Sequence, residues 1–464
     1  MSDPKSVIKF GTDGWRAIIS DTFTFENVRV VAQATADWVH KNNTQFADKK
    51  VAVGYDNRFL STEYARTFAE VLSGNGIKVY LSDASVPTPA LSYGVTLIKG
   101  VCGIMITASH NPAKFNGIKI KTSQGGAAPK DITSVVESYL GQSPVKQSND
   151  LIVMHDFKKS YVAFIRKYLN LKKIKTSKYK VLTDIMHGSG GTLMQDILRG
   201  TSVRLELMRA DINPGFDGSK PEPIPECLSG IMGRMKKEKI DLGLVLDGDA
   251  DRIAAVASGG EFVSPQRILG LLILHLVRNR NVEGGVIKTL CGSTMLDHIA
   301  KKLNRKLYET PVGFKYISDL MVSQKIVAGG EEAGGMGLPN YIPERDGSLA
   351  GLLLLEMMVY NKRNFKQLLD DMEKEFGRYY YLRLDYAMDA KKVDINKLKQ
   401  IKTVLGQQVV NVKDFDGVKL TCANEDWLMF RPSGTEPLVR IYAEAKSLQR
   451  SKDLLEFGRN LIDP

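Results

Sequence analysis

The sequence has few cysteines and none in a paired arrangement. Its four cysteines, Cys102, Cys227, Cys291 and Cys422, are far apart and form no C-x-x-C pair. Neither a zinc site nor a disulfide framework is therefore indicated. We expect these cysteines to be reduced residues of the core.

Long apolar runs are also absent. The two longest apolar stretches, 268–277 and 349–360, are interrupted by Gly, His or Glu, whereas a membrane-spanning helix needs about 20 apolar residues. The opening residues Met-Ser-Asp-Pro-Lys contain no apolar signal core. We expect a soluble cytoplasmic protein without a membrane partner.

Several functional motifs are missing as well. The sequence has no G-x-S-x-G elbow and no Walker A loop, which disfavours a serine hydrolase and an ATP-dependent kinase. The formal net charge is +12, but the basic residues are dispersed and no nucleic-acid-binding motif accompanies them. We expect no nucleic-acid partner, although a positive field would attract a phosphorylated small molecule.

The chain of 464 residues is long enough for about three domains of roughly 150 residues each. Strands and helices alternate from residue 50 onward. The first predicted unit is strand, helix, strand, helix, strand, at 51–53, 62–72, 79–81, 90–98 and 104–106. This order is typical of a parallel sheet covered by helices.

The same alternation returns twice. Further strands are predicted at 180–183, 203–207, 242–246, 286–288, 306–309 and 326–328, with helices at 193–198, 295–303 and 316–322 between them. A hairpin at 253–264 follows the second unit. From about residue 378 the pattern changes to a separate α+β domain. We expect an α/β protein with three related βαβαβ mixed-sheet domains, 1–150, 151–265 and 266–375, and a smaller α+β domain, 376–464, around a central cleft.

Each predicted unit ends in a polar loop. The first such loop, Thr107 to Pro112, reads Thr-Ala-Ser-His-Asn-Pro and places Ser109 at the carboxyl end of a strand, where open α/β sheets bind ligands. The alternative is a turn in which Ser and Asn bond only backbone groups. His110 is a poor candidate base for Ser109, because adjacent side chains of an extended segment point to opposite faces.

The second loop carries three alternating carboxylates, Asp247, Asp249 and Asp251. They would repel one another unless a cation or basic partners neutralised them. A calcium EF-hand is disfavoured because its required Gly and Glu positions hold Arg252 and Ser258. Mg²⁺, which favours a few carboxylates and a phosphate oxygen, fits better. A solvated acidic turn is the alternative.

A further polar loop lies in the last domain. Arg431 can bond a phosphate with two N–H groups. Ser433, Gly434 and Thr435 add hydroxyls and accessible backbone N–H groups. The alternative is an N-capping turn.

Five motifs together identify a family. They are Phe-Gly-Thr-Asp-Gly-Trp-Arg at 10–16, Thr-Ala-Ser-His-Asn-Pro at 107–112, Asp-Gly-Asp-Ala-Asp-Arg at 247–252, Gly-Gly-Glu-Glu-Ala-Gly-Gly at 329–335 and Arg-Pro-Ser-Gly-Thr-Glu-Pro at 431–437. This ordered set resembles the α-D-phosphohexomutases, the family of phosphoglucomutase, phosphomannomutase and phosphoglucosamine mutase. Family members have three such domains and a smaller fourth.

The resemblance implies a role for the first two loops. Ser109 would carry a phosphoryl group, and the three aspartates would hold Mg²⁺ together with an oxygen of that phosphoserine. Arg252 would help to neutralise charge in the transition state, while His110 and Asn111 would organise the loop. Arg16 and Lys119 match positions near the transferring phosphoryl group, with the lysine as a possible general acid or base. An ordinary surface cation is the alternative for both.

The resemblance also assigns the substrate contacts. The Arg431 loop would bind the phosphate that is not reacting. Glu331 would accept hydrogen bonds from sugar hydroxyls. The alternative for Glu331 is a solvated loop carboxylate. Ala333 stands where a common family pattern, Gly-Glu-x-Ser-Gly, has serine. The segment from Pro311 to Lys315 resembles that of glucose-specific phosphoglucomutases, and it favours glucose.

The implied activity is an isomerase of carbohydrate metabolism. It would interconvert glucose 1-phosphate and glucose 6-phosphate through a hexose 1,6-bisphosphate, which would also act as activator. Hexose phosphates would be its partners. Phosphomannomutase and phosphoglucosamine mutase activities are the nearest alternatives. A non-catalytic sugar-phosphate sensor would keep the Arg431 loop but need neither Ser109 nor the aspartates.

Overall fold

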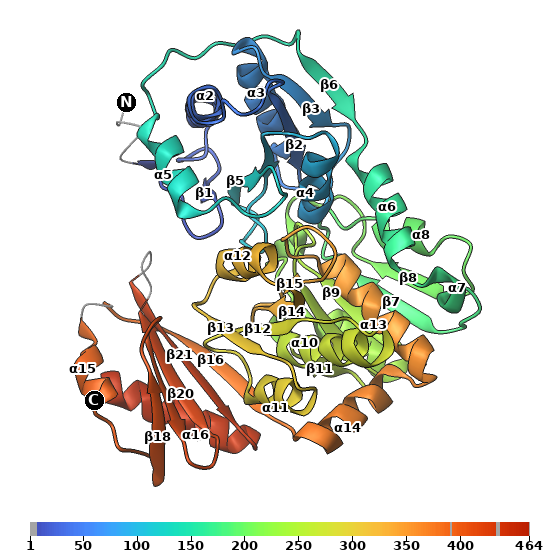
Figure 1. Ribbon diagram of the computed structural model, residues 1–464, viewed down its shortest axis with the longest axis vertical. Helices are drawn as coiled ribbons and strands as arrows, with labels where there is room; N and C mark the ends of the chain where they lie inside the picture. Colours follow the sequence, from blue (N-terminus) through green and yellow to red (C-terminus); the bar gives the residue numbers. More distant parts are fainter. Residues whose placement is uncertain (1–6, 390–391, 433–436, 464) are drawn as a thin grey trace.

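The computed structural model describes residues 7–389, 392–432 and 437–463 (Figure 1). Within them the chain forms four sheets. Figure 1 shows the first domain at the top, the second and third packed together below it, and the fourth at the lower left. Among the described helices, none is both long and apolar enough to cross a bilayer. All four cysteines are free, and Cys227 is only half-buried, so the prediction of a core position is wrong for that residue.

The first sheet has the strand order β1-β5-β4-β2-β3-β6. Its strands are β1 (Trp15–Ile18), β2 (Lys50–Tyr55), β3 (Lys78–Ser82), β4 (Cys102–Ile106), β5 (Phe115–Thr122) and β6 (Ile152–His155). Its helices are α2 (Phe25–Asn42), α3 (Ser61–Gly74), α4 (Thr88–Leu97) and α5 (Lys130–Ser138). Strands β2, β3 and β4 are parallel, and β5 returns antiparallel to β4.

The second sheet has the order β11-β10-β9-β7-β8. Its strands are β7 (Lys180–Asp184), β8 (Arg204–Met208), β9 (Leu242–Leu246), β10 (Ile253–Ala257) and β11 (Glu261–Val263). The helices of this part are α6 (Phe157–Tyr168), α7 (Leu171–Ile174), α8 (Leu193–Leu198) and α9 (Ser229–Lys237), with short 3₁₀ turns at Phe216–Gly218 and Pro225–Cys227. The predicted hairpin is the pair β10 and β11.

The third sheet has the order β13-β12-β14-β15. Its strands are β12 (Gly285–Thr289), β13 (Leu307–Thr310), β14 (Ile326–Gly330) and β15 (Met336–Gly337). Its helices are α10 (Pro265–Leu274), which a π-helical turn at His275–Asn279 extends, α11 (Thr294–Lys302), α12 (Phe314–Ser323), α13 (Gly347–Asn361) and α14 (Phe365–Phe376). The two apolar stretches in the sequence are thus buried helices of this part, α10 and α13.

The fourth sheet is antiparallel, with the order β16-β21-β20-β19-β18-β17. Its strands are β16 (Tyr380–Ala387), β17 (Thr403–Val404), β18 (Gln407–Lys413), β19 (Val418–Cys422), β20 (Trp427–Pro432) and β21 (Leu438–Ala445), and its helices are α15 (Ile395–Lys399) and α16 (Leu448–Ile462). A small apolar cluster that includes Cys291 and Trp427 packs this domain against the third.

The first three sheets share one topology. In each, the first strand of the unit lies between the second and the third, and an antiparallel strand returns beside the third. The third strands are therefore equivalent: β4, β9 and β14. They lead into the loops of Ser109, Asp247 and Glu331 respectively. The predicted fold class, with three related mixed-sheet domains and a smaller α+β domain, is confirmed.

Two elements cross the boundaries expected from the sequence. Strand β6 pairs with β3, so the first sheet extends to His155 and not only to residue 150. Helix α13 packs against β9 and β10 of the second domain. A helix that is apolar on all sides must be covered on all sides, and at Gly351 the side chains of Leu244 and Ile253 approach its backbone closely.

Candidate active site

A cleft of about 750 Å³ lies where all four domains meet. Its lining includes seven residues that were given roles from the sequence: Arg16, His110, Asn111, Arg252, Lys315, Glu331 and Arg431. Basic side chains outnumber acidic ones on its wall. The basic ones are Lys9, Arg16, Arg252, Lys315, Arg345, Arg383, Arg431 and Arg440, and the acidic ones are Asp13, Glu222, Glu331 and Glu332. The cleft therefore suits a ligand with more than one negative charge.

Ser109 is buried in the loop that follows β4 and has a left-handed backbone, with φ of 51°. Its hydroxyl donates a hydrogen bond of 2.8 Å to Asp247, and its amide donates one of 2.8 Å to the hydroxyl of Thr107. His110 Nδ1 lies 3.4 Å from the serine oxygen, closer than the alternation of an extended segment predicts. The turned backbone of Ser109 is the reason.

His110 lies among cations. Burial, together with Arg252, Arg16 and Lys119, holds its pKa well below the usual range. The imidazole is accordingly neutral at physiological pH. A neutral ring beside a serine that carries a phosphoryl group adds no charge of its own, which agrees with an organising role in the loop.

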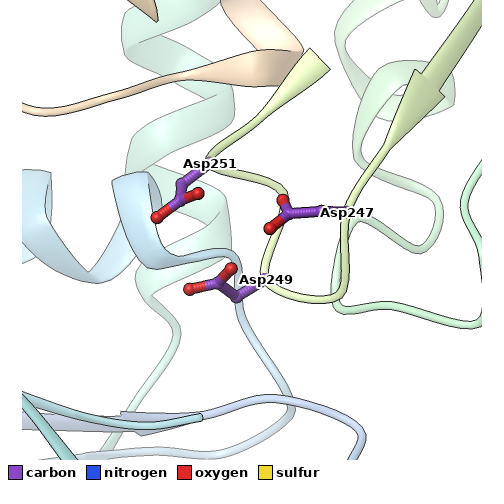
Figure 2. Close-up of side chains that lie close together, drawn as sticks. All are labelled: Asp247, Asp249 and Asp251. Atoms are coloured by element: carbon purple, nitrogen blue, oxygen red, sulfur yellow. The ribbon is translucent and has the colours of Figure 1, made fainter. Parts of the chain in front are cut away.

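The three aspartates belong to the loop between β9 and β10, and their side chains lie close together (Figure 2). One carboxylate oxygen from each lies within 4.8 Å of the others. All three side chains are buried. Burial, and then the charges of Asp249 and Asp251, raise the pKa of Asp247 well above its ordinary value. A solvated acidic turn is therefore ruled out, since these carboxylates are removed from water.

This donor set suits a hard divalent cation. Asp249 Oδ1 and Asp251 Oδ1 are buried and accept no hydrogen bond from the described residues. A buried acceptor without a partner is costly, and a cation among three carboxylates supplies that partner. Oxygen donors alone, with no histidine or thiolate, favour Mg²⁺ over zinc or copper.

The other carboxylate oxygens of Asp249 and Asp251 are held by Lys119, which is 1% exposed. Its ammonium lies 2.7 Å from Asp249 Oδ2, 2.9 Å from Asp251 Oδ2 and 3.1 Å from Asp13 Oδ2. Burial lowers the pKa of Lys119, but the three carboxylates outweigh burial and raise it. At Asp249 burial raises the pKa, but Lys119, Thr88 and Arg345 together outweigh burial and lower it. Lys119 is thus a buried, protonated group and not a surface cation.

Arg16 and Arg252 flank the same point. Arg16 donates a 2.7 Å bond to the side-chain oxygen of Asn111 and lies 3.5 Å from Asp13. Burial lowers its pKa, which Asp13 partly offsets. The backbone N–H of Arg252 donates a 3.0 Å bond to Asp247 Oδ1. Both guanidinium groups line the cleft.

Sequence reasoning missed Asp13 and Arg345. Arg345 Nη2 lies 2.5 Å from Asp13 Oδ2 and 2.7 Å from Asp251 Oδ2, and Nη1 lies 3.6 Å from Glu331. Burial raises the pKa of Asp13, but Arg345 and Lys119 outweigh it and hold that pKa well below its usual range. Asp13 lies inside the first motif, which offered a signal. Arg345 lies in a charged run before α13, and that run gave no signal for the site beyond the charge of the arginine.

The substrate contacts predicted from the sequence come from two other domains. Glu331 is 8% exposed, and burial raises its pKa to about 7 although Arg345 opposes the shift. Lys315 lies with its ammonium 4.8 Å from the ring centroid of Tyr316. Arg431 Nε lies 3.0 Å from Asp416, and Arg383 and Arg440 line the cleft beside it. Ser433, Gly434 and Thr435 lie outside the described residues.

Four family models match the chain in succession. They are described as phosphoglucomutase/phosphomannomutase α/β/α domain I, domain II and domain III and the C-terminal domain, and they match residues 7–144, 159–260, 264–376 and 385–460. The chain belongs to the α-D-phosphohexomutases. The resemblance that the five motifs carry is confirmed, and with it the enzyme class, an isomerase that transfers a phosphoryl group within its substrate.

Similar phosphohexomutases come from several organisms. A phosphoglucomutase/phosphomannomutase of Thermococcus kodakarensis is 27% identical over 98% of both chains, and a phosphoglucosamine/phosphogalactosamine mutase of Sulfurisphaera tokodaii is 28% identical over 98% of this chain and 99% of its own. A crystal structure of a Thermus thermophilus protein assigned as a phosphomannomutase has a TM-score of 0.89 and 32% identity, with both chains fully covered. These names differ in the hexose, and none supports the sensor alternative.

Proposed function

We propose that this phosphohexomutase is a phosphoglucomutase, which interconverts glucose 1-phosphate and glucose 6-phosphate through a phosphoserine at Ser109. The observation that carries the proposal is the hydrogen bond from the Ser109 hydroxyl to Asp247, within a buried carboxylate cluster beside a positively charged cleft. A serine placed there can carry a phosphoryl group in an environment that neutralises it.

The reaction has two phosphoryl transfers. In the first, the bond between phosphorus and Ser109 Oγ breaks, a bond forms to the free hydroxyl oxygen of the hexose phosphate, and that hydroxyl loses its proton to a base in the cleft. The resulting hexose 1,6-bisphosphate turns around. Its other phosphoryl group then returns to Ser109, and the freed sugar oxygen takes up a proton. The enzyme ends phosphorylated as it began, and added bisphosphate acts as activator by phosphorylating any free Ser109.

Asp247, Asp249 and Asp251, with a phosphoryl oxygen on Ser109, would hold Mg²⁺, which supplies positive charge to the transferring group. The chain's own residues do the remaining work. Lys119 and Arg345 fix the carboxylates through the contacts given above. Lys119 is protonated and buried, and because the carboxylates raise its pKa it keeps its proton and adds positive charge beside the transferring group. Arg16 and Arg252 add positive charge at the cleft wall.

The rest of the substrate faces the third and fourth domains. Glu331, ionised, would accept hydrogen bonds from two sugar hydroxyls, and Lys315 lines the same wall. Arg431, with Ser433, Gly434 and Thr435, would hold the phosphate that is not reacting. Domain by domain, 1–150 would supply the phosphoserine, 151–265 the metal site, 266–375 the sugar site and 376–464 the phosphate site.

The preferred hexose is tested by kcat/KM for glucose, mannose and glucosamine 1-phosphates, with Mg²⁺ and a trace of the matching bisphosphate. Glucose should give the largest value, because the segment from Pro311 to Lys315 resembles that of glucose-specific enzymes. A larger value for mannose or glucosamine would establish phosphomannomutase or phosphoglucosamine mutase activity instead. Turnover of none of the three would refute the proposed function.

A further inference from the structure

Three consecutive polar residues after β2 are buried beside the active site although none of them lines the main cleft. Asp56, Asn57 and Arg58 are 2%, 6% and 3% exposed. We refer to them as the Asp56–Arg58 segment. Strand β2 lies next to β4 in the first sheet, so its carboxyl end adjoins the loop that carries Ser109. Buried polar groups of this kind are retained only where they have partners.

The partners of Arg58 are backbone carbonyls of the Ser109 loop. Arg58 Nη2 donates bonds of 2.6 Å to the carbonyl oxygens of both Ser109 and Asn111, and Nη1 donates bonds of 2.9 Å to Pro112 and 3.0 Å to Phe115. One planar group thus spans the whole loop. Only a guanidinium has enough N–H groups in a fixed plane to do so.

Asp56 holds the start of the same loop. Its Oδ2 accepts a 2.6 Å hydrogen bond from the hydroxyl of Thr107, whose oxygen in turn accepts the 2.8 Å bond from the Ser109 amide. The same carboxylate oxygen lies 3.2 Å from Arg58 Nε, so the two charges neutralise each other inside the domain. The left-handed backbone of Ser109 is therefore fixed from both ends of the loop.

Asn57 faces the second domain. Its side-chain amide donates bonds of 3.0 Å and 2.9 Å to the carbonyl oxygens of His187 and Gly188. The next residue, Ser189, donates its amide N–H to the carbonyl oxygen of Gly248 in the aspartate loop, at 2.9 Å. A Cβ atom on Gly248 would lie 2.4 Å from the carbonyl oxygen of Ser109. The two loops thus touch at Gly248.

We propose that the Asp56–Arg58 segment positions the Ser109 loop against the aspartate loop, with Arg58 as the principal positioning residue of phosphoryl transfer. Arg58 acts through the Ser109 backbone and not on the reacting atoms. The segment reaches both loops from one stretch of three residues, so a shift in it displaces the nucleophile relative to the carboxylates. This inference rests on the proposed role of Ser109.

The first test is the Arg58→Lys variant of the full chain, assayed with Mg²⁺ and saturating bisphosphate. Lysine keeps the positive charge beside Asp56 but cannot span four carbonyls. We expect kcat to fall about 10- to 100-fold, the range typical of a lost supporting contact, while KM for the hexose phosphate is little changed. The matched control is Arg166→Lys, because Arg166 also donates to several carbonyls, among them those of Ile197 and Arg199, but does not line the cleft.

Either of two kinetic results would overturn the proposed role of Arg58. If kcat of Arg58→Lys equals that of Arg166→Lys, or if KM rises while kcat is unchanged, Arg58 does not position the nucleophile. Should Arg58→Lys fail to fold, Asn57→Ala serves in its place, because it leaves the buried ion pair intact. It should lower kcat and raise the Mg²⁺ concentration needed for half-maximal activity. Unchanged values of both would overturn the proposal.

A second measurement does not depend on turnover. Amide hydrogen exchange of residues 107–117 should be faster in Arg58→Lys than in the wild type and unchanged in Arg166→Lys. Unchanged exchange in Arg58→Lys overturns the positioning role even if the wild type is an active mutase. Faster exchange confined to this loop supports the role even if the wild type turns over no hexose phosphate, a result that would refute only the proposed function.

Discussion

The hydroxyl of Ser109 and the carboxylate of Asp247 are 2.8 Å apart although 138 positions separate them in the sequence. Ser109 follows β4 and Asp247 follows β9, and these strands occupy equivalent places in two sheets of the same topology. The carboxyl ends of such strands are where open α/β sheets bind ligands. Repetition of one domain plan thus brings the proposed nucleophile and the proposed metal ligands together at one buried point.

Replacement of the nucleophile is the most direct test of that arrangement. Ser109→Ala should lower mutase turnover by several orders of magnitude, because it removes the hydroxyl that would carry the phosphoryl group beside Asp247. Intact-mass measurement should show one phosphate on part of the wild type and none on the variant. Ser82→Ala is the control, since Ser82 is a buried serine of the same domain whose hydroxyl donates to the carbonyl oxygen of Ala84. Near-normal turnover in a folded Ser109→Ala protein contradicts the assignment.

Removal of one carboxylate tests the metal site. Asp249→Asn should weaken Mg²⁺ binding at least about tenfold and lower kcat, because it removes charge from the cluster. Wild-type activity should disappear with EDTA and return with Mg²⁺. Asp184→Asn is the control: Asp184 is also buried and ion-paired, but with Arg209 away from the cleft. Full activity of the wild type in metal-free buffer is incompatible with the proposed site.

Much of the architecture could be predicted because strand ends carry strong signals. The apolar run before Asp247 and the small polar residues after Ile106 fixed where β9 and β4 end, and the order of elements implied the repeat. Strands β1 and β5 were not predicted. Both strands interrupt apolar residues with charged ones, and β5 buries the lysines Lys119 and Lys121. A buried lysine in a strand is recognisable only when its carboxylate partners are known.

The network around the aspartates could not be predicted for the same reason. Lys119 binds Asp249 across 130 positions, and Arg345 binds Asp251 across 94. No local pattern encodes such pairs, since they depend on how three domains pack. The loop motifs were predictable because each lies within a few residues, whereas the cations that neutralise them come from strands and loops of other domains.

The buried carboxyl of Glu331 should make binding and stability depend on pH in opposite directions. Its folded-state pKa is about 7, against 4.5 ordinarily, so it is protonated at pH 6 and ionised at pH 8. Glu331 must be ionised to accept hydrogen bonds from the sugar hydroxyls. KM for the hexose phosphate should therefore fall as the pH rises from 6 to 8. In Glu331→Gln this pH dependence should disappear, and KM should stay high. A KM profile of Glu331→Gln that matches the wild type contradicts the role.

The stability effect has the opposite sign. Because the folded state holds the proton more tightly than the unfolded state, stability is lost as the pH rises from about 4.5 to about 7. The cost of ionising buried Glu331 is on the order of 3 kcal/mol at pH 8. Glu331→Gln should therefore gain stability relative to the wild type between pH 5 and pH 8, as measured by urea unfolding at each pH. A difference that is constant with pH would show that Glu331 ionises normally.

The fourth domain should hold one phosphate while the other end of the sugar reacts at Ser109. Arg431 lies on the cleft wall, with Nε 3.0 Å from Asp416. Because the bisphosphate would turn around in the proposed reaction, such a clamp would have to accept either end of the sugar. Arg431→Ala should therefore weaken binding of both the 1-phosphate and the 6-phosphate by about 2 kcal/mol, typical of a lost charge-assisted hydrogen bond. More hexose 1,6-bisphosphate should also escape during turnover.

The measurement is steady-state kinetics in both directions, with free bisphosphate quantified during turnover. Arg450→Ala is the matched control, because Arg450 also pairs through Nε with an aspartate of the fourth domain, Asp426 at 2.9 Å, but does not line the cleft. A variant that only loosens the domain should behave as Arg450→Ala does. If Arg431→Ala impairs one direction alone, the residue contacts a fixed end of the sugar. If KM is unchanged in both directions, Arg431 does not hold the non-reacting phosphate, and the excess of arginines on this wall serves another purpose.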